Sequence, residues 1–370
     1  MRYQPELCVW ETTLACNLSC RHCGSSAGKP RDNELDTSEA LGLLQALAEL
    51  GTAELTLSGG ELFVRPDWRQ LLGRARELGL SCLVVSNGLA ITREVAQELG
   101  RQKVGSVSLS VDGGARVHDW LRPPNRLLGS ELSGPVGMQG VSSHEQLHFA
   151  IDNLRAAELP VAAITQVSRT NLHELPAIAD FLVSHAIEAW QIQLTAPMGR
   201  SARQGGAERV AVLEPEDLPS LYAFIRRVQD EGRLRCLAAD CIGYFGSDEP
   251  LLRRFERPND SFWQGCQGGM RVVGITSDGG VKGCLSMPDA FLEGNIRERP
   301  LAAIWRDESA FAYNRKFEVD SLSAGCSGCA FGKLCRAGCH SFAATAQGGD
   351  ISRYDYCIRL RAPEPGASRR

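Results

Sequence analysis

Three cysteines near the start of the chain, Cys16, Cys20 and Cys23, have a spacing that suits an iron–sulfur cluster. Thiolates this close on one loop can hold three irons of a [4Fe–4S] cubane, and the fourth iron then has no protein ligand. Because such clusters normally take four cysteines, three suggest that another molecule binds the open iron. The alternative is a zinc site with His22 as a fourth ligand, but structural zinc favours four ligands in paired Cys-x2-Cys spacing.

A second group of cysteines occupies the last third of the chain. It has seven members, which are Cys266, Cys284, Cys326, Cys329, Cys335, Cys339 and Cys357. The chain has 14 cysteines in all, and because a cytosolic compartment keeps thiols reduced, so many indicate metal rather than disulfides. A zinc site would explain the run from Cys326 to Cys339 alone, but not the whole series.

Polar side chains and glycines recur between these two groups, each time within or just after a short apolar run. They are Gly59, Gly60 and Glu61, then Ser86 and Asn87, then Ser110 and Asp112, and finally Gln166 and Gln193. Glycines let a backbone approach another group closely, and a carboxylate such as that of Glu61 can pair with an ammonium group. Each residue alone could be an ordinary polar strand end. Together they predict a binding site if the apolar runs are neighbouring strands.

The elements that must position these groups are strands alternating with helices. The predicted strands are Cys8–Thr13, Ala53–Leu57, Ser81–Ser86, Ser106–Val111, Val161–Val167 and Trp190–Leu194. The helical stretch Thr37–Leu50 opens with Asp36 and Glu39 at capping-box spacing, and another helix is expected from Ser142 to about Glu158. This alternation predicts βαβ units with a parallel sheet. Six units are too few for a full TIM barrel, so we predict an α/β fold with a partial (β/α)6 TIM-like barrel.

The N-terminal residues resemble the signature of the radical S-adenosylmethionine (SAM) superfamily. His22 stands in the slot before the third cysteine, and Gly59-Gly60-Glu61 follows one βα unit later, as in that family. The resemblance implies that SAM binds the open iron and is cleaved to a 5′-deoxyadenosyl radical, which takes hydrogen from a substrate. It also implies that Glu61 contacts the SAM amino group, and that Ser110 and Asp112 bind its ribose or methionyl part. An external electron donor such as flavodoxin or ferredoxin is implied as well.

The C-terminal cysteines resemble the seven-cysteine motif of the SPASM domain in every spacing. The resemblance implies two auxiliary [4Fe–4S] clusters, and thus three clusters per chain. The outer one would take Cys326, Cys329, Cys335 and Cys357, and the inner one Cys266, Cys284 and Cys339. The inner cluster then lacks one ligand, and residues 255–265 contain no cysteine. Cys241 and Cys236 are the nearest candidates, and an open iron that the substrate ligates is the alternative.

We divide the chain into a barrel (8–231), a linker (232–265), a SPASM domain (266–360) and a disordered tail (361–370). The SPASM domain is expected to contain a β-hairpin, formed by Val272–Thr276 and Val281–Cys284, and short helices such as Leu301–Trp305. Between Asp112 and Ser142 the chain is rich in Gly, Pro and Ser and shows no periodicity. We interpret this stretch either as a loop that covers the substrate or as a surface insertion.

Enzymes with a SPASM domain mostly modify ribosomally made peptides, so the resemblance favours a precursor peptide as substrate. A small molecule, such as a sugar or a tetrapyrrole side chain, is the alternative, and a multi-cluster electron-transfer protein is a second one. The first strand starts about seven residues after Met1, so any peptide leader would bind a separate protein or the barrel surface. Leu285 follows Cys284 where sulfatase maturases carry an aspartate, which counts against sulfatase maturation. No general acid or base can be assigned.

Composition narrows the partners and the location. The net charge of −4 lacks the basic excess of nucleic-acid-binding proteins. No signal peptide precedes the first strand, and no run approaches the roughly 20 apolar residues of a membrane span. We therefore expect a cytoplasmic protein with neither nucleic-acid nor membrane partners.

Overall fold

The computed structural model describes residues 3–125, 141–187, 189–202, 209–245, 249–253 and 262–361. Strands and helices alternate along the first two thirds of the chain, as predicted. The strands are β1 (Leu7–Glu11), β2 (Glu54–Ser58), β3 (Ser81–Ser86), β4 (Ser106–Ser110), β5 (Val161–Val167), β6 (Ala189–Leu194) and β7 (Arg235–Ala238). Each pairs in parallel with the next. The α/β barrel-like architecture is therefore confirmed, and β7 adds a parallel strand within the stretch 232–265.

The sheet continues into the C-terminal region. Its order is β10-β9-β8-β1-β2-β3-β4-β5-β6-β7, with β8 at Val272–Ile275, β9 at Gly280–Lys282 and β10 at Gly294–Asn295. Strand β8 pairs in parallel with β1 and forms the expected antiparallel hairpin with β9. The first strands of the cysteine-rich region thus extend the barrel sheet beyond β1.

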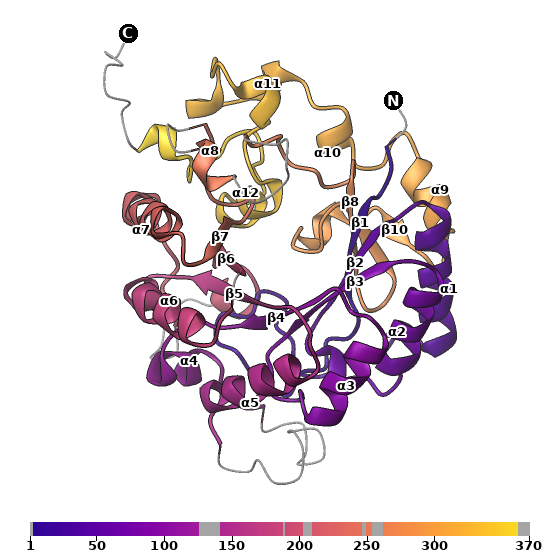
Figure 1. Cartoon of the computed structure of the whole chain (residues 1–370). Helices are drawn as coiled ribbons and strands as arrows, with labels where there is room; N and C mark the ends of the chain where they lie inside the picture. The colour runs from indigo at the N-terminus through magenta and orange to yellow at the C-terminus, as the bar shows by residue number, and fades with distance from the viewer. Residues whose placement is uncertain are drawn as a thin grey trace.

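Helices cover the outer face of the sheet (Figure 1). They are α1 (Thr37–Glu49), α2 (Trp68–Glu77), α3 (Arg93–Arg101), α4 (Ala115–Leu121), α5 (Ser143–Ala156), α6 (Leu175–Ser184) and α7 (Leu218–Glu231). The predicted capping box of α1 is present, since the Asp36 side chain accepts from the Glu39 backbone and the Glu39 side chain accepts in return. The expectation of an aperiodic stretch between 112 and 142 was wrong in part, because α4 lies there; residues 126–140 are outside the described residues.

The core lies between the sheet and these helices. Alternate strand residues are buried, as in Trp10 of β1 and Trp190 of β6, which are both fully inaccessible. Burial of side chains of this size stabilises the fold by about 2–3 kcal/mol each. Trp190 also donates its indole N–H to Thr165 Oγ1 at 2.8 Å, so its polar atom is satisfied. Cys8 and Cys82 belong to the same core, as the sequence predicted.

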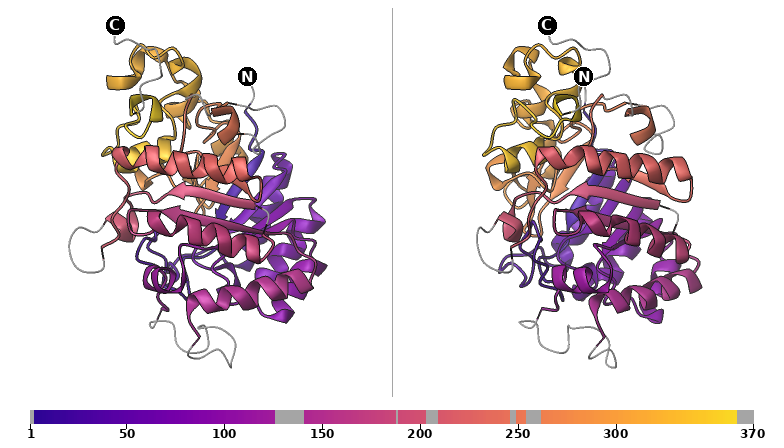
Figure 2. Two further views of the ribbon diagram at one scale, coloured as in Figure 1. Left: turned by 60° about the vertical axis from the view of Figure 1, so that its left-hand side comes forward. Right: turned by 90° about the vertical axis from the view of Figure 1, so that its left-hand side faces the viewer.

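The C-terminal region contains short helices connected by turns. They are α8 (Glu249–Leu252), α9 (Leu301–Arg306), α10 (Ala312–Arg315), α11 (Gly332–Cys335) and α12 (His340–Ala346). Helices α8 and α12 lie near α7 and β7, whereas α9 lies beside α1 (Figure 1 and Figure 2). Trp305 of α9 donates its indole N–H to Tyr3 O, which ties the region to the N-terminus. The expected disordered tail falls almost wholly on residues 362–370, outside the described residues. Among the described helices, none is long and apolar enough to cross a membrane.

Candidate iron–sulfur and SAM site

The three N-terminal cysteines lie together on the loop that follows β1. Cys16 and Cys20 are buried and Cys23 is half-buried. Burial raises the pKa of the Cys16 thiol, and the neighbouring Cys20 and Cys23 raise it further. Backbone amides point at the sulfurs, since Leu18 N donates to Cys16 Sγ at 3.4 Å and Ala27 N donates to Cys23 Sγ at 3.3 Å. Such N–H···S bonds stabilise thiolates that carry a cluster.

The segment after β6 holds this loop in place. Arg200 donates from Nε to Cys20 O at 2.6 Å and from Nη1 to Ala27 O at 2.8 Å. Its own backbone N–H donates to Cys23 O. Gly199, at φ +56°, allows this contact, because a Cβ there would lie 2.1 Å from Gly24 O. Two segments about 180 residues apart in sequence therefore fix the loop jointly.

The Gly59-Gly60-Glu61 segment approaches the same loop from β2. A Cβ on Gly60 would lie 2.1 Å from Ala15 O, and Gly59 has φ +133°, so neither position suits a side chain. The Glu61 carboxylate is 1% exposed and accepts from Ser86 Oγ at 3.0 Å and Asn87 N at 2.9 Å. Burial raises its pKa to about 7. This carboxylate therefore lacks a close cationic partner within the described chain and can receive one from a ligand.

Asp112, at the end of β4, is also a buried carboxylate, but unlike Glu61 it has basic side chains in contact with it. It forms ion pairs with Arg122 Nε at 2.6 Å and with His22 Nε2 at 3.0 Å. Burial alone would raise its pKa, but Arg122 and His22 outweigh burial and hold the pKa well below its ordinary value. Its Oδ1 also accepts from Gln166 N at 2.9 Å. Because Arg122 Nη1 also lies 3.8 Å from Cys20 Sγ, the cation connects this network to the cysteine loop.

Sequence reasoning missed Arg122, which lies one residue beyond α4 in a stretch predicted to lack regular structure. The other predicted polar residues fall where parallel strands end. Asn87 donates to Asn17 Oδ1 at 2.7 Å and lies 3.8 Å from Cys16 Sγ, and Ser110 is buried beside them on β4. Gln193 Oε1 on β6 accepts from Gln191 Nε2 at 3.4 Å, and among the described residues its side chain makes no hydrogen bond to the cysteine loop. The structure thus brings most of the predicted residues to one end of the sheet.

The inner C-terminal cysteines form a second group. Cys266 raises the pKa of the Cys284 and Cys339 thiols, after the larger effect of burial. The Ser341 hydroxyl hydrogen-bonds to both of these thiols. Cys241 belongs to this group, because it also raises the pKa of Cys339. The two cysteines considered for the missing ligand both belong to the core. Cys236 lies in β7, whereas Cys241 lies close enough to Cys339 to raise the pKa of its thiol.

The outer cysteines form a third group. Burial raises the pKa of the Cys335 thiol, and its neighbours Cys357, Cys326 and Cys329 raise it further. Backbone groups hydrogen-bond to these sulfurs, from Tyr354 to Cys326, from Gly338 to Cys335, and from Arg359 and Leu360 to Cys357. Across the described ranges, no three potential ligands converge tightly enough to hold one metal ion.

Comparison with known proteins agrees with this geometry. The family model for the radical SAM superfamily matches residues 10–182. The AdoMet-dependent heme synthase of Methanosarcina barkeri is 30% identical over 97% of this chain and 97% of its own length. The chain belongs to the radical SAM superfamily. It is therefore a radical SAM enzyme, with a C-terminal SPASM domain whose model, the iron–sulfur cluster-binding domain, matches residues 266–330.

Other relatives of this radical SAM enzyme differ in what they act on. The mycofactocin maturase MftC of Mycobacterium tuberculosis is 28% identical over 90% of this chain and 78% of its own length. Streptococcus suis SuiB bound to S-adenosylmethionine superposes with a TM-score of 0.70 at 15% identity, covering 95% of this chain and 76% of SuiB. The enzyme anSMEcpe with bound AdoMet and a peptide gives 0.69 at 16% identity, over 96% and 94% of the two chains. These two structures support the fold only.

The residues of this radical SAM enzyme fit the cofactor that its family uses. Three cysteines would leave one iron of a cubane open, and Glu61 is a buried carboxylate that accepts from the uncharged donors Ser86 Oγ and Asn87 N. The SAM ammonium is the kind of cation that such a carboxylate can bind. Two more groups of cysteines fit auxiliary clusters by the same chemistry.

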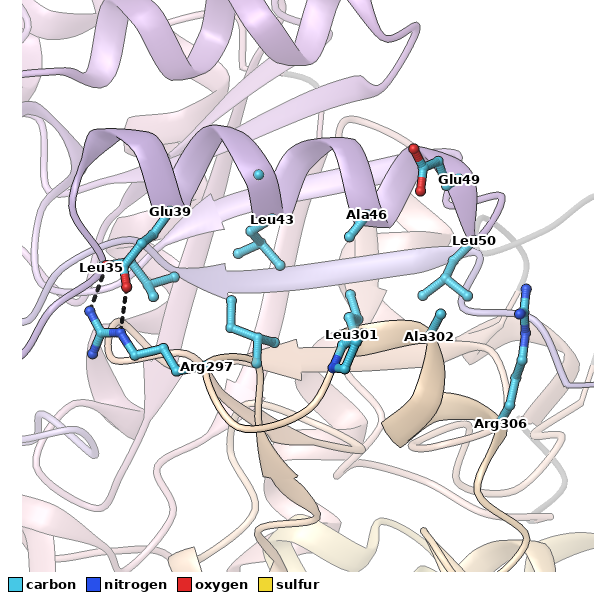
Figure 3. Close-up of a pocket in the computed structure, with 13 residues that line it drawn as sticks. Leu35, Glu39, Leu43, Ala46, Glu49, Leu50, Arg297, Leu301, Ala302 and Arg306 are labelled. Atoms are coloured by element: carbon cyan, nitrogen blue, oxygen red, sulfur yellow. Dashed lines mark hydrogen bonds and ion pairs between the residues drawn. The ribbon is translucent and has the colours of Figure 1, made fainter.

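A cavity of this enzyme lies away from these residues. It has a volume of about 440 Å³ and is lined by α1 and by residues 296–306, including Leu43, Leu50 and Leu301 (Figure 3). The ion pair of Arg297 with Glu39, at 2.6 Å, lies at one side of it. None of the predicted site residues lines it.

Proposed function

We propose that this enzyme oxidises its substrate by removing a hydrogen atom and then an electron. The arrangement that supports this proposal is the presence of two cysteine groups in addition to the SAM-site triad. We assign Cys16, Cys20 and Cys23 to the SAM cluster, Cys266, Cys284 and Cys339 to the inner auxiliary cluster, and Cys326, Cys329, Cys335 and Cys357 to the outer one. When bound, the reduced N-terminal cluster and SAM supply the 5′-deoxyadenosyl radical, and the auxiliary clusters accept the substrate's electron.

The protein's own residues bind and orient SAM. Glu61 receives the SAM ammonium, while Ser86 and Asn87 fix the carboxylate with their hydrogen bonds. Arg122 keeps Asp112 ionised, and Asp112 Oδ1 accepts a hydrogen bond from the backbone N–H of Gln166 on β5. Gly59, Ser110 and Gln193 complete the lining at the strand ends. Burial of Glu61, Ser86, Asn87, Ser110 and Asp112 excludes water from a radical that would otherwise react with it.

The fourth ligand of the inner cluster is, in our proposal, Cys241. It is buried beside Cys339, and Leu194 N at the end of β6 donates to its sulfur at 3.2 Å. This bond would tie the inner cluster to the strand that carries Gln193.

The substrate is best supported as a small carboxylated molecule of the tetrapyrrole class. The observation behind this choice is the match to heme synthases along nearly the full length of both chains. A ribosomally made precursor peptide, which the SPASM resemblance favoured, is the second candidate, and the match to the maturase MftC supports it. Both candidates are compatible with hydrogen abstraction followed by electron removal.

Deuterium transfer distinguishes the two candidates. The reconstituted enzyme is incubated anaerobically with SAM and a reductant. One sample receives a porphyrin deuterated on its propionate side chains, and the other receives a deuterated precursor peptide encoded next to the gene of this enzyme. Deuterium in 5′-deoxyadenosine identifies the substrate from which hydrogen was taken. If only the peptide transfers deuterium, the tetrapyrrole proposal is wrong.

Substitution of the triad tests the cluster assignment. The Cys16→Ala, Cys20→Ala, Cys23→Ala variant should form no 5′-deoxyadenosine and should keep about eight irons, the number expected for two remaining cubanes. SAM cleavage by this variant would contradict the assignment. Loss of all iron would contradict the proposal that the auxiliary clusters are separate from the triad.

A further inference from the structure

One tyrosine lies between the two auxiliary cluster sites and contacts both. The backbone of Tyr354 hydrogen-bonds to the outer cysteine Cys326, and its carbonyl accepts from Cys357 N at 3.3 Å. Its hydroxyl donates to the carbonyl of Cys241 at 2.6 Å. The side chain is 1% exposed. A single residue thus connects two outer cysteines with the segment proposed to complete the inner site.

A second tyrosine extends this connection to Cys339. The Tyr244 hydroxyl accepts from Cys339 N at 3.1 Å and donates to the carbonyl of Asp240. Its ring contacts that of Tyr354, with centroids 5.1 Å apart and nearly perpendicular planes. Edge-to-face pairs of this kind add about 0.5–1.5 kcal/mol beyond the burial of their surface. The two rings and their hydroxyls therefore form one buried unit.

The backbone around this pair is constrained on both sides. Gly338 lies between Cys335 and Cys339, and a Cβ there would lie 2.9 Å from atoms of both tyrosine rings. Tyr244 itself has φ +105°, which is a rare conformation for a residue with a side chain. Backbone conformations of this kind persist only where surrounding contacts enforce them, and they concentrate at functional sites.

We propose that Tyr354 and Tyr244 are positioning residues that hold Cys241 and Cys339 in place for the inner auxiliary cluster and fix that site relative to the outer one. This inference deepens the proposed function and rests on its assignment of two auxiliary clusters. The hydrogen bond from Tyr354 places the Cys241 segment, and the bond to Tyr244 places Cys339. Without them the inner site would keep its cysteines but lose their geometry.

Substitution of Tyr354 by phenylalanine tests this role, because it removes the hydroxyl and keeps the ring. Tyr356→Phe is the matched control: its hydroxyl donates to Leu213 O at 2.9 Å, away from the cluster cysteines. Both are made in the Cys16→Ala, Cys20→Ala, Cys23→Ala background, so that only auxiliary clusters contribute. Iron content and the electron paramagnetic resonance (EPR) spectrum of the reduced protein are then measured.

Tyr354→Phe should lower the intensity of one auxiliary EPR signal by about two- to tenfold, as expected for loss of one hydrogen bond. Iron should fall from about eight toward about four per chain, and Tyr356→Phe should leave both unchanged. Cys241→Ser should weaken the same signal as Tyr354→Phe. Unchanged iron and spectra in Tyr354→Phe, or an equal loss in Tyr356→Phe, would overturn the proposal, as would an intact inner signal in Cys241→Ser.

The result can be separated from failure of the proposed function. Tyr354→Phe in the chain with its triad intact should still cleave SAM, because the tyrosine contacts none of the SAM-site residues in the described structure. If the parent triad variant holds no auxiliary iron, the proposed function fails first, and the positioning role fails with it. Equal thermal midpoints of the two tyrosine variants exclude misfolding as the cause of a difference.

Discussion

Replacement of Glu61 by glutamine should weaken SAM binding and, at the same time, stabilise the protein without SAM. Glutamine keeps the size of the side chain but carries no charge. A hydrogen bond between charged groups contributes about 1.5–3 kcal/mol, which corresponds to a loss of SAM affinity of roughly ten- to 150-fold. Isothermal titration of the reconstituted enzyme with SAM at pH 8 measures this loss.

The stability gain follows from the pKa of Glu61. Burial raises this pKa from 4.5 to about 7, a difference of about 2.5 units. At about 1.4 kcal/mol per unit, the buried charge at pH 8 costs about 3 kcal/mol. The native state binds the proton more tightly than the unfolded chain, so stability falls as pH rises from 4.5 through 7. Glu61→Gln should therefore raise the thermal midpoint, more at pH 8 than at pH 6.

Glu98→Gln is the control, because Glu98 lies on α3 and pairs with Arg101 at the surface. It should leave SAM affinity unchanged. The reasoning is refuted if Glu61→Gln binds SAM within about twofold of the parent at pH 8, a difference smaller than one ordinary hydrogen bond provides. A thermal midpoint that falls in the variant would refute the stability argument separately.

Two further substitutions test the clusters. Gly60→Ala would place a Cβ 2.1 Å from Ala15 O, so we expect this variant to lose the SAM-site cluster and, with it, about four irons per chain. Gly73→Ala on α2 is the control, because the nearest atom to its Cβ would be 3.7 Å away, and it should keep its full iron content and activity. Asp240→Asn removes a charge that raises the pKa of the Cys266, Cys284 and Cys339 thiols. Because a nearby negative charge disfavours reduction, one auxiliary cluster of this variant should have a more positive midpoint potential in a redox titration. An unchanged or more negative potential would contradict the position of the Asp240 carboxylate beside these cysteines.

The strand limits were predicted well where turn residues flank the strands in the sequence. β3 and β5 match the predicted limits at both ends, and Gly79 and Pro160 stand just before them. Strand β7 was missed because it has only four residues, and its alternation of Cys, Leu and Ala is too short to show a period. Helix α4 was missed for a similar reason, since its seven residues, Ala115–Leu121, give barely two turns.

The cysteine spacings could be read directly, but the contacts between distant segments could not. Arg122 joins Asp112 to the cysteine loop only because α4 turns the chain back over the end of β4. Cys241 belongs beside Cys339 only because the chain after β7 passes Tyr354, which lies more than a hundred residues later. Neither residue stands at a motif spacing, so each depends on tertiary structure that local patterns do not encode.

The two buried carboxylates of the proposed SAM site differ in a way that explains how this site would recognise a cation. Asp112 and Glu61 are both almost wholly inaccessible, yet burial raises the pKa of Glu61, while Asp112 stays ionised because Arg122 and His22 contact it. Asp112 is neutralised from within the protein, so it has little to gain from a charged ligand. Glu61 has only neutral donors, and its charge becomes favourable when a ligand supplies the ammonium group. SAM binding should therefore lower the pKa of Glu61, and SAM affinity should rise between pH 6 and pH 8.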